Sequence, residues 1–239
     1  MTSKCGGFRI LSMTACLILA AALSAAGQGA KAELADKVTA LKQSVAQNQQ
    51  RLHQYQWTET TQLTLKGEPK PPKQFLCQYG PDGQVQKTPI ASEGVQPSPG
   101  GRFKQRMVNK KTEEIQDYMG DVKTLLSVYV PPDPVKLQQA YQAGNASISK
   151  GAAPGTVLLS LQNYDKPGDQ LSITFNASAK KIGQLSVKTY MQQPSDAVTL
   201  DTHFASLPDG TNYPQKIVLN MAAKKMVVTT TNSQYQKLQ

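Results

Sequence analysis

The side chains that could do catalytic chemistry are few and scattered. The histidines are His53 and His203, and the cysteines are Cys5, Cys16 and Cys77. A cysteine nucleophile needs a histidine base beside it, and none of these residues stands in a recognisable catalytic motif. The serine-hydrolase elbow, the zinc-binding His-Glu-x-x-His pattern and the phosphate-binding glycine loop do not occur either. We therefore expect a protein that is not an enzyme and that uses no cofactor.

Three carboxylates have a spacing that could hold a divalent cation. Glu113, Asp117 and Asp121 recur on successive turns of a predicted helix, and carboxylate oxygens are ligands for such ions. Lys110 and Lys123 lie beside them, which favours a solvated face of mixed charge over a metal centre. The sequence therefore predicts no metal site.

The first residues have the composition of an export signal. Lys4 and Arg9 precede an apolar run that ends in small residues, the order typical of a secretory signal peptide. We expect residues 1–32 to be removed, with cleavage after Ala26 or Ala32, and the mature protein to lie in the periplasm or outside the cell. An uncleaved anchor and a lipidated second cysteine are the alternatives.

The chain is basic, with 26 Lys and Arg against 16 Asp and Glu. Removing residues 1–32 leaves 23 basic residues, most of them lysines, and a net charge of +7. Proteins that read nucleic acids concentrate arginine and aromatic residues on one element, so we expect no nucleic-acid partner. Dispersed lysine suits solubility and an anionic membrane surface. Cys77 would be the remaining thiol, so residues 33–239 must form a single domain without an internal disulfide.

Apolar spacing predicts three helices and a set of strands. Helices are expected over 33–53, 102–130 and 135–143, the last capped by Asp133. A surface loop rich in proline and glycine is expected over 89–101. Alternating runs predict strands over 55–65, 74–79, 84–88, 157–164, 170–176, 183–191, 197–204, 215–222 and 226–232.

The strands after residue 155 have one apolar and one polar parity, so one face of their sheet must be covered. We expect an α+β fold, in which a curved antiparallel sheet forms a half-barrel-like meander and an N-terminal helix and central helices cover one face. If a ligand shares the covered face, its lining would be Leu126, Tyr129, Leu171, Ile173, Phe175, Leu185, Val187, Leu200, Phe204 and Leu219.

Two late segments carry a resemblance to a known family. Residues 207–219, which begin Leu-Pro-Asp-Gly, and residues 225–232 resemble the late hairpin of the LolA/RseB-like periplasmic lipoprotein-carrier superfamily. The resemblance implies an exported bacterial protein that binds a lipid, an acyl chain or a lipoprotein in the concave face of its sheet. The alternative is a non-catalytic structural or protein-interaction module of the cell envelope with a fully packed core.

Overall fold

A computed structural model describes residues 47–90, 102–176, 178–179 and 181–238 of the chain. Its strands are β1 (Tyr55–Leu65), β2 (Glu68–Pro69), β3 (Lys73–Tyr79), β4 (Val85–Pro89), β5 (Ala146–Lys150), β6 (Thr156–Gln162), β7 (Gln170–Asn176), β8 (Lys181–Tyr190), β9 (Ala197–Ser206), β10 (Asn212–Met221) and β11 (Met226–Lys237). Residues 47–52 are helical. The other helices are α2 (Arg102–Leu126), α3 (Pro134–Gln142) and the 3-10 turn η1 (Ala222–Lys224).

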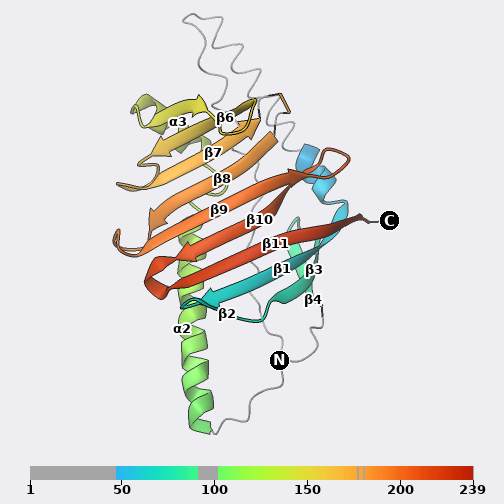
Figure 1. The fold of residues 1–239 in the computed structure, drawn as a ribbon, viewed down its shortest axis with the longest axis vertical. Coiled ribbons are helices and arrows are strands. Elements are labelled where there is room, and N and C mark those ends of the chain that lie inside the picture. The colour runs from blue at the N-terminus through green and yellow to red at the C-terminus, as the bar shows by residue number, and fades with distance from the viewer. Residues whose placement is uncertain (1–46, 91–101, 177, 180, 239) are drawn as a thin grey trace, which may run out of the picture.

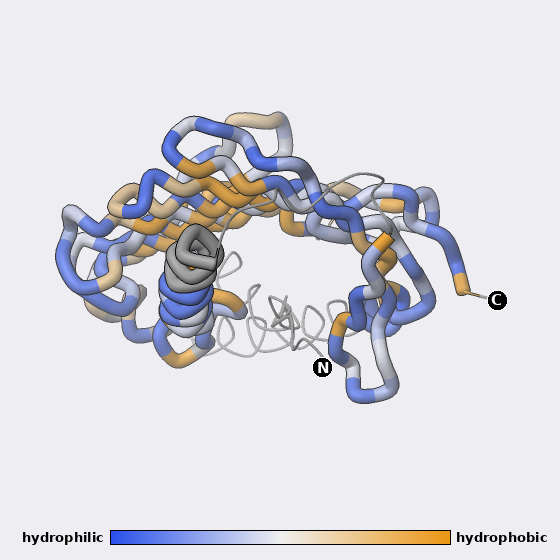
Figure 2. The backbone as a smooth tube through the Cα atoms, turned by 90° about the horizontal axis from the view of Figure 1, so that it is seen from below, coloured by the Kyte–Doolittle hydropathy of each residue, from blue (hydrophilic) through white to orange (hydrophobic). Residues whose placement is uncertain are grey.

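All the described strands belong to one antiparallel sheet (Figure 1). Its order is β4-β3-β1-β11-β10-β9-β8-β7-β6-β5, and β2 pairs with β1 alone. The sheet is curved and not closed into a barrel, and α2 lies on its hollow side (Figure 2). The predicted α+β fold with a curved antiparallel sheet is therefore confirmed.

Alternation of apolar and polar residues decides which face each strand buries. In β8, Leu185 and Val187 are each 1 % exposed, whereas Lys188 points to solvent. Val187 lies opposite Leu200 of β9, which in turn lies opposite Leu219 of β10. A shift of one residue in this register would move the apolar set to the outer face, so burial fixes the pairing.

The N-terminal strand β1 lies inside the sheet, third from the edge that β4 forms. β1 pairs with β11 on one side, where Leu63 lies opposite Val228 and Leu65 opposite Met226. On its other side β1 pairs with β3, which continues into β4 through a tight turn. In that turn Gly83 has a φ of 70°, a left-handed conformation that favours glycine. The hairpin predicted for this segment is confirmed.

Helices α2 and α3 cover part of the hollow face. Val122 and Leu126 of α2 and Leu137 of α3 are buried in one cluster with side chains of β6 to β11. Asp133 begins α3, because its Oδ1 atom accepts the backbone N–H of Val135 at 2.8 Å. The predicted cap and the predicted cover by the central helices are both present.

A buried carboxylate fastens the chain after α2 to the sheet. Asp169 is fully buried and accepts the backbone N–H groups of Tyr164, Asp165 and Lys166 at 2.6, 3.0 and 2.9 Å. It also accepts the hydroxyl of Tyr129 at 2.6 Å. A buried charge is tolerated only when it has such a set of donors. We call these contacts the Asp169 latch.

Some predicted elements differ from the structure or lie outside it. The sequence pattern did not predict β2 or β5, which are short and carry few apolar side chains. The signal peptide, most of the helix over 33–53 and most of the loop over 89–101 lie outside the described residues. Among the described helices, none is both long and apolar enough to cross a membrane.

The latch predicts a large effect of Asp169→Asn on stability. The amide removes the negative charge and turns one accepting oxygen into a donor that faces other donors, so we expect the free energy of unfolding to fall by about 3 kcal/mol. Urea denaturation followed by circular dichroism measures it. The matched control is Asp201→Asn on the outer face, where the carboxylate accepts the Ser186 hydroxyl at 2.5 Å and is half-buried. Equal losses for both variants would contradict the latch.

Candidate functional site

The ten side chains predicted to line a ligand site lie together in one apolar cluster on the hollow face. Eight of them are at most 4 % exposed, namely Leu126, Tyr129, Leu171, Ile173, Leu185, Val187, Leu200 and Leu219. Phe175 and Phe204 are half-buried and pack against the others. The structure therefore unites the whole predicted set, which we call the apolar cluster.

Tyr129 is the polar member of the apolar cluster. Its hydroxyl donates to Oδ2 of Asp169 and lies 2.8 Å from the hydroxyl of Thr189. Its ring packs against that of Tyr164, with 5.5 Å between the centroids. Burial, and then the hydrogen bond to Asp169, raise the pKa of Tyr129. The phenol therefore stays neutral and fixes the position of the chain where α2 has ended.

Helix α2 reaches the apolar cluster along one stripe. Its residues that pack there recur at spacings of three and four: Ile115, Tyr118, Met119, Val122, Leu125 and Leu126. Glu113, Asp117 and Asp121 are exposed, as a solvated face requires. Within the described residues, no group of histidine, cysteine and acidic side chains is placed to hold a metal ion.

A second group of buried side chains on the hollow face was not predicted. Trp57 is 4 % exposed and shares the parity of Leu63 and Leu65 on β1, which pack on the core. Its ring stacks on Tyr235, with centroids 5.5 Å apart and an interplanar angle of 10°, and lies 5.4 Å from Tyr79. We call Trp57, Tyr79 and Tyr235 the aromatic cluster.

An ion pair lies beside the aromatic cluster. Glu59 is 3 % exposed, and its Oε1 atom accepts the ammonium of Lys87 at 2.5 Å and the hydroxyl of Thr61 at 3.2 Å. Lys87 also lies 5.9 Å from the centre of the Phe75 ring. Burying two charges is tolerated when the geometry is good and further hydrogen bonds satisfy the carboxylate. The hollow face therefore has an apolar half and a half that is aromatic and charged.

Cys77 lies inside this second half. It is fully buried, and it stands opposite Trp57 on β1 and opposite Lys87 on β4. Burial, and secondarily the charge of Glu59, raise the pKa of the Cys77 thiol to about 12. The predicted role as a small buried hydrophobe agrees with this environment.

The comparisons with known proteins give a likeness of fold. No family model and no curated protein matches the chain. A DUF1329 family protein from Desulfovibrio piger aligns with 83 % of this chain and 92 % of its own, at 8 % identity and a TM-score of 0.37. A LolA superfamily protein from Nitrosomonas europaea aligns with 82 % of this chain and 93 % of its own, at 11 % identity and a TM-score of 0.35. The chain resembles both in fold alone.

One signal in the sequence pointed to the second half of the face. Glu59 occupies the same parity of β1 as Trp57 and Leu63. Because side chains alternate along a strand, recognising this strand is enough to place the Glu59 carboxylate on the covered side. Its partner Lys87 lies on β4, and the pairing of β1 with β3 that brings the two residues together was not predictable from the sequence pattern. The aromatic cluster was missed for the same reason, because Tyr235 comes from the last strand.

Burial predicts that Cys77 is inert in the folded protein. At pH 8 we expect iodoacetamide to leave Cys77 unmodified, because the thiolate is scarce and the sulfur is inaccessible. In urea the same residue should react, which peptide mass mapping can show. Cys77→Ser should lower the free energy of unfolding by about 1 kcal/mol. Equal modification rates in the folded and unfolded protein would contradict this environment.

Proposed function

We propose that this chain is an exported periplasmic protein that binds a lipid, an acyl chain or the acyl part of a lipoprotein on the hollow face of its sheet. The observation that carries the proposal is the way in which α2 meets the apolar cluster, along a single stripe of its surface. Apolar contacts have no directional requirement, so an acyl chain can replace a helix stripe against the same side chains. The protein would bind without catalysing a reaction.

The polar contacts of α2 suggest how a ligand would enter. The Tyr118 hydroxyl donates to Asp196 at 2.9 Å, and its ring lies 5.2 Å from the Lys224 ammonium. Asp196 follows β8 and Lys224 follows β10, so both belong to turns at the rim that also holds Asp169 and Tyr129. A helix fastened along one rim can swing away from the sheet and keep these hydrogen bonds.

The second half of the face suits the polar end of such a ligand. Glu59 and Lys87 place two opposite charges beside the aromatic cluster. Binding sites for small molecules are mostly apolar and contain a few convergent polar groups that fix orientation. A lipid with its acyl chain on the apolar cluster would therefore direct its headgroup toward this ion pair.

One observation favours the alternative, a structural or interaction module with a packed core. Eight of the ten apolar-cluster residues are at most 4 % exposed under the protein's own helices and strands. Protein interiors pack as densely as this when helices alone fill the space. The two functions differ in one measurable property, which is saturable uptake of an apolar ligand.

The decisive experiment titrates the protein with a fluorescent fatty acid. We expect the wild type to take up the probe with saturation at a defined stoichiometry. Phe204→Glu should abolish uptake, because its half-buried ring packs on the apolar cluster and a charge there is costly.

The matched control for this experiment is Val218→Glu on the next strand. Val218 lies opposite Asp201 and is also half-buried, but its parity places it on the outer face. This variant should bind the probe like the wild type, and circular dichroism confirms that both variants fold. A folded wild type that takes up no probe would contradict the proposal. The structural or interaction module with a packed core would then be the function that remains.

A further inference from the structure

Two lysine-bearing turns meet at one end of the sheet. The β1–β2 turn begins at Lys66, and the turn between β10 and β11 ends at Lys225. The backbone N–H of Lys66 donates to the carbonyl oxygen of Lys225 at 2.7 Å, which joins the two turns. Lys70 directly follows β2, and Lys224 lies in η1 within the second turn. We call these four residues the lysine turns.

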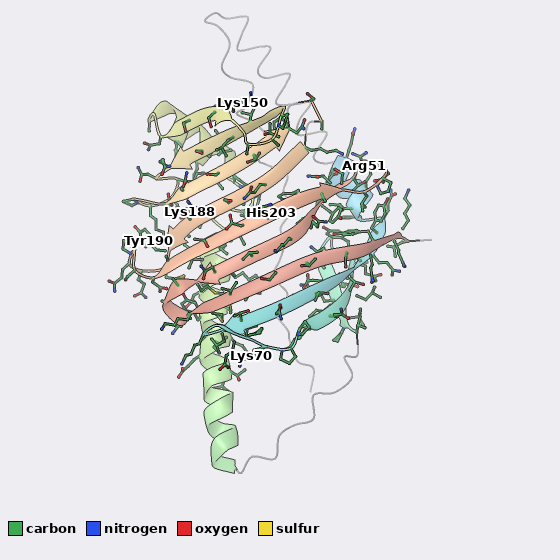
Figure 3. All side chains as sticks on the ribbon, in the orientation of Figure 1. Arg51, Lys70, Lys150, Lys188, Tyr190 and His203 are labelled. Carbon is green, nitrogen blue, oxygen red and sulfur yellow. The ribbon has the colours of Figure 1, made fainter. Side chains whose placement is uncertain are left out.

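The lysine turns are exposed and strongly positive. All four side chains are exposed, and Figure 3 shows Lys70 at the lower end of the sheet. The acidic residue beside them is Glu68 of β2, whose carboxylate lies 3.1 Å from the Lys70 ammonium with both side chains open to solvent. An exposed ion pair of this kind is weak and is screened by salt. The two turns therefore keep a net positive charge of three.

Helix α2 carries residues of both charges near the same end. Lys224 lies over the ring of Tyr118, which places the middle of α2 beside the lysine turns. From there the helix extends past the sheet toward Arg102 (Figure 1). Residues 102–111 contain five lysines and arginines and no acidic residue. The exposed carboxylates Glu113, Asp117 and Asp121 lie between or beside this segment and Tyr118, so the docking charge is that of the lysine turns alone.

We propose that the lysine turns dock this protein on a membrane surface that contains anionic phospholipids. Lysine ammonium groups on turns are compact charges on flexible stems, which suits a fluid layer of phosphate headgroups. Readers of nucleic acids use arginine together with aromatic side chains on base edges, and the lysine turns offer neither. The charges of the surface and the protein are complementary, and the surface need not supply the ligand of the hollow face.

Vesicle flotation tests this proposal with full-length mature protein. The probe is a phosphatidylcholine vesicle that contains about 30 % phosphatidylglycerol, at roughly 0.1 M salt. Replacing all four lysines of the lysine turns by glutamine should lower the partition coefficient roughly six-hundredfold, because each lysine near such a surface contributes about a fivefold factor. Binding should also weaken as salt increases.

The matched control replaces four exposed lysines elsewhere: Lys150, Lys188, Lys216 and Lys237. Figure 3 shows Lys150 and Lys188 on other parts of the sheet. Both variants lose the same total charge, but the control lysines lie away from the docking end. The control should therefore lower partitioning by less than about fivefold. Equal losses, equal binding to vesicles without phosphatidylglycerol, or tighter binding to a DNA duplex would each overturn the proposal.

The outcome is separable from the proposed function. A second variant keeps Lys224, which contacts Tyr118 of α2, and replaces only Lys66, Lys70 and Lys225. Its fatty-acid uptake should match that of the wild type, because none of these three residues belongs to the apolar cluster. Loss of vesicle binding with normal uptake supports docking by this end. Normal vesicle binding by the variant that lacks all four lysines overturns the docking proposal, whether or not the hollow face takes a ligand.

Discussion

A sheet with one apolar face has to have that face covered, and this constraint governs the structure. The strands from β6 to β11 bury alternate residues, and the cover comes from one stripe of α2 and from Leu137 of α3. A register slip of one residue would turn the apolar side chains of a strand to the outer face, so burial fixes the register of the sheet. The sheet in turn positions the turns that hold α2. The Asp169 latch is one consequence, since a helix that covers a curved face needs an anchor at its end.

The hollow face combines two kinds of chemistry that cover alone does not require. Aliphatic side chains suffice to fill the half under α2, yet the other half buries Trp57 beside the Glu59–Lys87 pair. Replacing a buried ion pair by apolar residues is often neutral or stabilising, so such a pair is weak evidence for stability alone. An amphipathic ligand of the kind we propose would use both halves, with the apolar cluster for its chain and the polar half for its head.

Local pattern predicted much of the fold and the apolar half of the site. Strand parity alone put Leu171, Leu185 and Leu200 on one face, because side chains alternate in every strand. β5 escaped prediction because five residues with one large apolar side chain, Ile148, give too short a pattern. The aromatic cluster was not predicted, because Trp57 contacts Tyr235 only when β1 pairs with β11. No local sequence feature predicts that pairing.

We propose that the hollow face exchanges helix contacts for an apolar ligand. Native mass spectrometry of the protein, purified gently from its own cell envelope, tests this most directly, because a retained lipid adds a discrete mass. We predict one lipid-sized adduct per chain, which an organic solvent removes and which a large share of the molecules carry. A uniform ligand-free mass, from a protein that also fails to acquire added fatty acid, would contradict the account and establish a packed core.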